Sequence, residues 1–421
     1  MKLWDFCKKN QEISIYGCGK YGNLLKEFLD EKNVKIKSFI ISDGQIKKEN
    51  YGISSCFLSE WKRKYRQQNH GILIAVSKFF QEEIIANLEA ENIKNYFVIS
   101  EQDMEIKNIG VMDTTVGAVN HGNEIIMQAV YKYLKLAYEK DFIIKFPFLD
   151  DFGPYSIKFM EDCKYIFLGG TNALNSKMNV EKYIGVNEKN LDSLYNKVIL
   201  MGVGWLCYES NPNFYTQKIL NVILNKEILH SVRDSYTENK LKSIGVNNVI
   251  NTGCPTIWGF DEEHCKTIPT GKSDEVIMML TPRQMEQDVA IVKAIRENYK
   301  KIYFWIQSPW DYHYIKSLCP EAIQISSELV DLENFLETHK KIDYVGTRLH
   351  GGLKCLQHRK RTIIIAIDNR AIEMKNDFHL PVILPEEVEQ LDDKINGDFI
   401  TDIHLPKENI IKWLRQFDNW S

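Results

Sequence analysis

Hydrophobic and polar positions follow one another along the chain in blocks that predict strands and helices in turn. Short apolar runs such as Ile13–Tyr16 and Thr362–Ile367 have the length of buried strands, and helical repeats such as Asn23–Leu29 and Ile125–Ala137 lie between runs of this kind. Strands that alternate with helices favour parallel sheets, and nearly continuous apolar strands favour sheets that are covered on both faces. The pattern therefore predicts an α/β fold along the whole chain.

The first hundred residues contain a strand, a glycine-rich turn and a helix in direct succession. A second predicted strand, Val34–Ile41, ends just before an acidic residue. This is the order of the dinucleotide fold, in which glycines allow a tight turn, the helix N-terminus faces a phosphate and the acid meets a ribose hydroxyl. The candidate ligand-binding residues of this region are Gly17, Gly19, Gly22 and Asp43.

The pattern of this first module ends after about 100 residues, roughly half of a full dinucleotide-binding domain. We therefore predict a Rossmann-like accessory domain over residues 1–103 with no redox role. It resembles small nucleotide-fold modules of bacterial sugar-modifying enzymes, some of which bind a sugar nucleotide, so a sugar nucleotide is a candidate ligand, and an accessory domain without a ligand is the alternative. The charged link Glu101–Lys107 marks the domain boundary.

Two further α/β units are predicted after the link, over residues 108–268 and 269–421, with a hinge near Ile268–Ser273. In open α/β sheets, ligands bind beyond the carboxyl ends of the strands. Several polar or glycine positions follow directly after predicted strands and are candidates for an anion site there: Gly169, Gly170, Arg233, Arg283, Arg348, His350 and Gly351.

The segment 340–356 has the strongest pattern, because an apolar strand runs through Gly346 into a helix that begins near Gly351. Arg348 and His350 lie two positions apart, so in an extended backbone they would project to the same side. A permanent cation and a group that titrates near neutral pH would then lie beside the positive end of a helix. The alternative is a packing or capping histidine and a surface arginine.

Gly346-Thr-Arg-Leu-His-Gly351 resembles the signature of the polysaccharide pyruvyltransferase family, and the resemblance extends over residues 108–421. Ser231-Val-Arg-Asp234 and the Gly169-Gly170 turn are similar to further family elements. The resemblance implies a GT-B-like pair of Rossmann-like domains and a transferase that moves the enolpyruvyl group of phosphoenolpyruvate onto a sugar or a lipid-linked glycan of the cell surface. It implies no cofactor and no metal.

The same resemblance gives each candidate residue a role. We expect Arg233 and Arg348 to clamp the donor with help from Arg283, and His350 to act as a general acid or to stabilise the departing phosphate. Two positions depart from the family pattern, since Asn123 and Cys254 stand where many members have an aspartate. A nucleotide-sugar glycosyltransferase and a non-catalytic sugar-nucleotide sensor remain alternatives.

Composition limits the partners of the protein. The net charge of −4 argues against a nucleic-acid binder, and no segment approaches the roughly 20 apolar residues that span a bilayer. Nine cysteines without a metal-binding spacing are expected to be reduced thiols, and their odd number fits a cytoplasmic protein. Contact with a membrane would then come through the acceptor.

Overall fold

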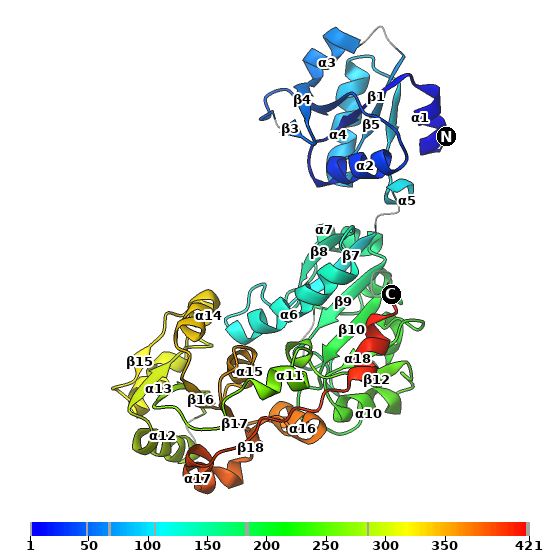
Figure 1. Ribbon diagram of the computed structural model, residues 1–421. Helices are drawn as coiled ribbons and strands as arrows, with labels where there is room; N and C mark the ends of the chain where they lie inside the picture. The colour runs from blue at the N-terminus through cyan, green and yellow to red at the C-terminus, as the bar shows by residue number, and fades with distance from the viewer. Residues whose placement is uncertain are drawn as a thin grey trace. The chain divides into compact units, whose positions relative to one another are not determined.

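The computed structural model describes residues 2–47, 49–65, 69–104, 107–181, 185–283 and 286–417. The chain forms two compact units, Met1–Asn108 with Lys140–Phe142, and Ile109–Glu139 with Ile143–Ser421. Figure 1 shows the first unit in blue and the second in cyan to red. The predicted link Glu101–Lys107 includes residues 105–106, which lie outside the described residues.

The first unit contains a six-stranded sheet in the order β3-β4-β2-β1-β5-β6. All neighbours pair in parallel except β3 and β4, which are antiparallel. Without the short β3, the parallel strands have the doubly wound dinucleotide order 3-2-1-4-5, so the module has five of the six strands rather than the predicted half. The elements are α1 (Leu3–Lys9), β1 (Glu12–Tyr16), α2 (Lys20–Glu31), β2 (Ser38–Ile41), β3 (Glu49–Asn50), β4 (Ile53–Phe57), α3 (Leu58–Tyr65), β5 (His70–Ile74), α4 (Lys78–Ala90), β6 (Tyr96–Val98) and α5 (Glu101–Met104).

The second unit begins with a sheet in the order β12-β11-β10-β9-β7-β8. The central strands are buried along their length because helices cover both faces, as in β10 and β7. We call this part the first half. Its elements are β7 (Asn108–Asp113), α6 (His121–Ala137), β8 (Phe142–Pro147), α7 (Pro154–Asp162), β9 (Tyr165–Gly169), α8 (Leu191–Leu194), β10 (Val198–Val203), α9 (Phe214–Ile223), β11 (His230–Val232), α10 (Ser235–Ser243), β12 (Val249–Asn251), η1 (Pro255–Ile257) and α11 (Glu262–Lys266).

The third sheet, in the second half of the same unit, has the order β15-β14-β13-β16-β17-β18 with every pair parallel. This is the doubly wound dinucleotide order, whereas the first-half sheet has the other common doubly wound order, 2-1-3-4-5, with a sixth strand. Two doubly wound sheets in one unit confirm the predicted GT-B-like pair. Its elements are β13 (Glu275–Met279), α12 (Glu286–Asn298), β14 (Lys301–Phe304), α13 (Asp311–Leu318), β15 (Ile323–Gln324), α14 (Leu329–Thr338), β16 (Asp343–Gly346), α15 (Leu349–Gln357), β17 (Thr362–Ile365), α16 (Asn369–Phe378), β18 (Val382–Ile383), η2 (Pro385–Gln390), α17 (Leu391–Asn396) and α18 (Lys407–Leu414).

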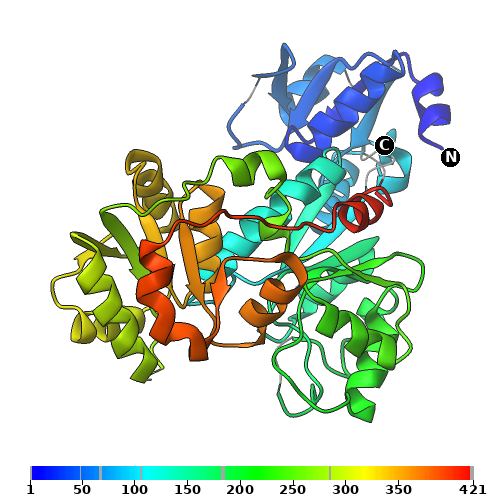
Figure 2. The same cartoon turned by 60° about the horizontal axis from the view of Figure 1, so that its bottom comes forward.

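The two halves share one hydrophobic core. The C-terminal chain, red in Figure 2, returns from the second half to the first, where Trp413 and Phe417 pack against Phe167 of β9. Helix α6 of the first half packs against α15 of the second in the same core. The relative position of the two halves is therefore fixed by buried apolar surface.

No helix within the described ranges combines the length and the apolar character that crossing a membrane requires.

Candidate functional site

The third sheet reverses its strand order between β13 and β16, where a doubly wound fold offers a crevice. The two strands lie very close there, because a Cβ atom on Gly346 would meet the Met279 carbonyl oxygen at 2.2 Å. The Thr347 N–H donates to the same carbonyl at 2.8 Å, and the Thr347 hydroxyl accepts from the Thr281 N–H at 2.7 Å. The signature segment therefore leaves the sheet at a point where these contacts hold it close to the end of β13.

Arg233 follows β11 at the carboxyl edge of the first-half sheet, and its side chain is only 2% exposed. Its Nε donates to Asp234 at 2.9 Å, and its Nη1 donates to the Asn172 side chain. A Cβ atom on Gly204 would lie 2.0 Å from the Arg233 Cζ, so the guanidinium lies directly on a glycine. Asp234 also caps α10 through the Thr237 N–H at 2.8 Å. Arg233 therefore forms a salt bridge at the start of the helix that Asp234 caps.

His350 lies in the first turn of α15, and it is buried. Burial, the charge of Arg370 and the charge of Arg233 lower its pKa to about 3, while Asp368 opposes them. The imidazole is therefore neutral at neutral pH in the free protein. Charges from both halves therefore lower the pKa of His350, since Arg233 belongs to the first half and Arg370 to the second. We call Arg233, His350 and Arg370 the Arg–His cluster.

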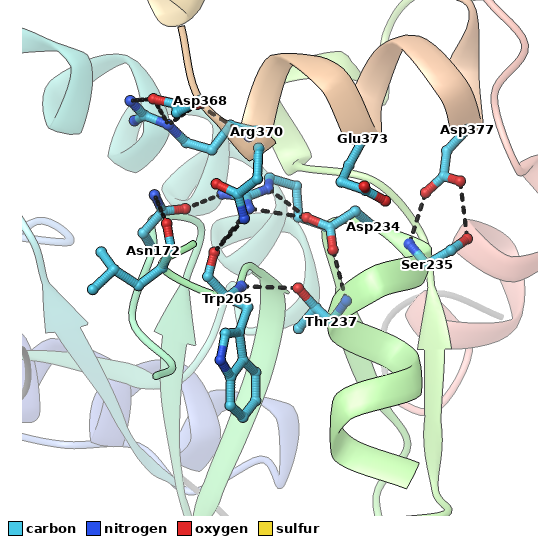
Figure 3. A network of polar contacts seen from close by, with 12 residues as sticks. Asn172, Trp205, Asp234, Ser235, Thr237, Asp368, Arg370, Glu373 and Asp377 are labelled. Carbon is cyan, nitrogen blue, oxygen red and sulfur yellow. Dashed lines mark hydrogen bonds and ion pairs between the residues drawn. The ribbon is translucent and has the colours of Figure 1, made fainter. Parts of the chain in front are cut away.

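Helix α16, which the sequence analysis did not predict, supplies Arg370. Figure 3 shows Arg370 bonded to Asp368, with Glu373 and Asp377 further along the helix on the side that faces Asp234 and Ser235. Against the effect of burial, Arg370 and Arg233 lower the pKa of Asp368. Burial raises the pKa of Glu373, and the nearby Asp234 adds to this effect.

The same helix joins the two halves beside the cluster. Asp377 accepts the Ser235 N–H at 2.7 Å, Asn369 donates to the Trp205 carbonyl at 3.1 Å, and the Tyr208 hydroxyl donates to Glu373 at 2.5 Å. A sequence signal for α16 existed: Asp368 follows the apolar strand β17, as Asp234 follows β11, and caps the helix through the Arg370 N–H.

Arg348 and Arg283, the two other predicted donor-binding cations, are each paired within the second half. Arg348 forms an ion pair with the fully buried Asp311, and Arg283 lies 3.0 Å from Asp288. Because α15 begins at Leu349, the backbone is already helical at His350, and the condition for Arg348 and His350 projecting to one side is not met. Burial raises the pKa of Asp311, although Arg348 opposes it.

The predicted glycine loops are tightly packed. A Cβ atom on Gly170 would meet Ile126 at 2.1 Å, and one on Gly169 would meet Val130 at 2.6 Å, so both glycines allow α6 to approach β9. The Gly351 N–H donates to the Gln307 side chain at 3.1 Å. Gln307 also donates to Asn120, the cap of α6, at 3.0 Å. An anion at Gly351 would have to displace Gln307.

The glycine turn of the first unit has the expected strand–turn–helix geometry. Gly17 has a positive φ of 113° and lies against the Ala75 carbonyl, and a Cβ atom on Gly22 would meet the Gly17 carbonyl oxygen at 1.9 Å. Gly19 precedes α2 without a side-chain cap. Asp43 is exposed and accepts the Ser59 hydroxyl at 2.6 Å. Ligand binding by this turn stays a prediction.

The two departures from the family pattern have structural roles that need no carboxylate. Asn123 donates to the Thr114 carbonyl at 3.0 Å, and Asn120 rather than Asn123 caps α6. Cys254 is buried, and burial raises the pKa of its thiol. Among the described residues no group of three or more histidine, cysteine or acidic side chains could hold a metal ion. That no metal is needed stays a prediction.

Comparison with known proteins identifies the second unit. The sequence model of the family described as "Polysaccharide pyruvyl transferase" matches residues 120–369, more than half of the 421 residues. No curated protein matches the chain. Among solved structures, a protein provisionally assigned as a UDP-N-acetylglucosamine 2-epimerase from Listeria monocytogenes is similar at 10% identity and a TM-score of 0.31, over 96% of this chain and 95% of that chain. So low a TM-score adds nothing to the functional argument. The family match confirms the resemblance of the signature segment: the chain belongs to the polysaccharide pyruvyl transferase family, a family of enzymes.

Proposed function

We propose that the protein transfers the pyruvyl group of phosphoenolpyruvate to a sugar of a cell-surface glycan or its precursor and releases phosphate. The observation that carries the proposal is the Arg–His cluster, in which the charges of Arg233 in the first half and Arg370 in the second both lower the pKa of His350. Phosphoenolpyruvate carries a phosphate and a carboxylate, and guanidinium groups suit both.

The hydrogen bonds of the two arginines leave N–H groups for a donor. Arg370 uses Nε and Nη2 on Asp368, and no contact occupies its Nη1 among the described residues. Arg233 uses Nε and Nη2 on Asp234 and one Nη1 hydrogen on Asn172. We therefore assign the main cationic contact to Arg370 and a second one to Arg233. Arg348 uses Nη2 on Asp311, and its Nε has no hydrogen-bond partner among the described residues, so Arg348 can add a further contact to the donor.

The reaction adds a proton to the methylene carbon of the donor, forms a bond between a sugar oxygen and C2, and breaks the bond from C2 to the phosphate oxygen. Attack by a second hydroxyl would close a ketal, and the proton of that hydroxyl restores the acid that protonated the methylene carbon. Glu373 is our candidate for protonating the methylene carbon, because its raised pKa favours the acid form beside Arg233.

His350 is our candidate for the proton of the attacking hydroxyl. It is neutral in the free protein, and so it can accept this proton. The negative charge of the bound donor would raise its pKa, and the imidazolium could then donate to the departing phosphate. This extends the role of general acid expected from the sequence.

The test uses the His350→Ala variant with phosphoenolpyruvate and envelope glycan, and measures phosphate release by ³¹P NMR. We expect turnover to fall by about 10²- to 10⁴-fold while the circular dichroism spectrum is unchanged. His313→Ala, which changes an exposed histidine of α13, is the matched control and should keep full activity.

Near-normal turnover in His350→Ala would contradict the assignment. Release of a nucleoside diphosphate from a sugar nucleotide, with no consumption of phosphoenolpyruvate, would favour the glycosyltransferase alternative.

A further inference from the structure

A second cavity, of about 350 Å³, lies between α6, α15 and the η1–α11 segment that leads from the first half to the second. It does not include the Arg–His cluster. Its described lining contains two lysines and a histidine but no acidic residue, together with amide and aromatic side chains: Gln128, Lys132, Tyr133, Phe260, His264, Lys354 and Gln357. Its volume is at the lower end of the range for small-molecule sites, about 300–1,000 Å³.

We propose that this cavity binds a small phosphorylated sugar. The positive lining is expected to hold the phosphate, and the rings of Tyr133 and Phe260 with the two glutamines are expected to face the sugar. The inference is independent of the reaction proposed above, because it concerns a different set of residues.

The ammonium group of Lys354, at the base of the cavity, is held in place by hydrogen bonds. Lys354 is only 6% exposed, and its Nζ donates to Gln128 at 2.7 Å and to Glu333 at 2.8 Å. A buried ammonium group costs free energy unless it is paired and hydrogen-bonded, so its position is held by these contacts. Glu333 does not line the cavity, and the third ammonium hydrogen can be offered to a ligand.

A lysine at the opening adds positive charge, and a histidine of the lining adds a ring nitrogen that can contact a ligand. Lys132 has no carboxylate partner in the described part of the chain, and its Nζ lies 5.5 Å from the centroid of the Tyr133 ring. His264 donates from Nε2 to the Leu356 carbonyl at 2.8 Å, which fixes its ring and leaves Nδ1 for another contact. Gln357 is similarly held, since its Nε2 donates to the Thr256 carbonyl at 2.8 Å.

An occupant would connect the two halves beside the active site. Lys132 lies on α6 of the first half, and Lys354 lies on α15 of the second, one helical turn of about 6 Å after His350. The other end of α6 contacts the site through Asn120 and Gln307. A ligand that touches both helices would favour the arrangement of the halves in which the cluster is assembled.

The experiment is titration calorimetry of the full chain with glucose 6-phosphate, with glucose and inorganic phosphate as separate arms. We expect Lys132→Gln to weaken the binding of glucose 6-phosphate about tenfold, since one charged contact is lost. Lys135→Gln, one turn along α6 and outside this cavity, is the matched control and should bind as the natural protein does.

Gly259→Phe gives a second variant at the rim, where an added Cβ atom meets nothing within 4 Å, and it should abolish binding by blocking the cavity. Binding that is unchanged in both Lys132→Gln and Gly259→Phe would overturn the proposal. Binding that is lost in Arg370→Gln instead would place the ligand at the Arg–His cluster and also overturn it. Equal affinity for glucose, or for inorganic phosphate alone, would exclude a phosphorylated sugar as the ligand class.

Discussion

Arg233 and Arg348 occupy equivalent places in the two halves, yet their guanidinium groups have different surroundings. Each arginine follows a parallel strand at the carboxyl edge of its sheet and stands directly before or at the start of a helix. Arg233 pairs with Asp234, the next residue, and its charge still acts on His350 of the other half. Arg348 pairs with Asp311 of its own half. In the second half, the charge that lowers the pKa of His350 is that of Arg370 rather than that of Arg348.

The comparison shows that the position of an arginine at the end of a strand does not by itself determine which carboxylate or ligand it contacts. Asp311 is fully buried and also accepts the N–H groups of Gln307 and Ser308, so it holds Arg348 against the turn after β14. The Arg233 pair lies at the junction of the halves, where α16 meets α10. We infer that Arg348 orders the second half while Arg233 belongs to the reacting site.

The largest expected effect is on stability, from Asp311→Ala. The change leaves Arg348 buried without its partner and removes the acceptor of two backbone N–H groups. Breaking a buried pair in this way costs about 3–5 kcal/mol of unfolding free energy, which urea denaturation would measure.

Asp274→Ala is the matched control, because its pair with Lys300 is exposed and exposed pairs contribute little to stability. If Asp311→Ala were no less stable than this control, the division of roles between the two arginines would be wrong.

Gly204→Ala should separate the position of Arg233 from its charge. The added methyl group would lie 2.0 Å from the Arg233 Cζ, so the guanidinium must shift although every charge is retained. A displacement of about 1 Å in a site of this kind can reduce turnover about 10²-fold, which the phosphate-release assay would detect.

Gly153→Ala, where the new Cβ atom has open space, should keep full turnover. Full activity of Gly204→Ala would show that the exact position of Arg233 does not matter.

The smallest expected effect concerns how far the free energy of unfolding falls at acid pH. The folded-state pKa of His350 is about 3, against an ordinary value of 6.5. Because this pKa is lowered on folding, the contribution of His350 to stability is complete above about pH 6.5 and is lost as the pH falls from there towards 3. Between pH 7 and pH 5 the loss is about 2 kcal/mol, from 1.4 kcal/mol per pH unit.

His350→Gln should therefore lose about 2 kcal/mol less than the natural protein when urea unfolding is compared at pH 7 and pH 5. His230, whose pKa is also lowered, to about 4, is present in both proteins and cancels. Parallel losses in the two proteins would mean that His350 is not held neutral.

Several elements could be predicted from short-range pattern. The strand predicted at Ile13–Tyr16 is β1, Glu12–Tyr16, and the helix predicted at Ile125–Ala137 is part of α6. The sequence predicts that the helix after the signature begins near Gly351, but α15 begins at Leu349. Gly351 and Gly352 suggested a later start because glycine disfavours helix interiors. In the structure they allow close packing against Met279 and Ile364, a reason that lies in another strand.

Helix α16 shows most clearly what the sequence pattern could not predict, because this helix was not predicted and yet supplies Arg370 and Glu373. Its apolar positions Ala371, Met374 and Phe378 form a short stripe that is buried in the core shared by the two halves, so tertiary packing rather than local pattern stabilises the helix.

The sequence alone determined the alternating α/β order, the signature segment and the strand ends at which polar groups stand, because each of these depends on neighbouring residues in the chain. The tertiary structure decided that Arg348 pairs with Asp311 and which charges lower the pKa of His350. These interactions join residues far apart in the chain, such as Arg233 and His350, and depend on burial, which sets the strength of every charge interaction.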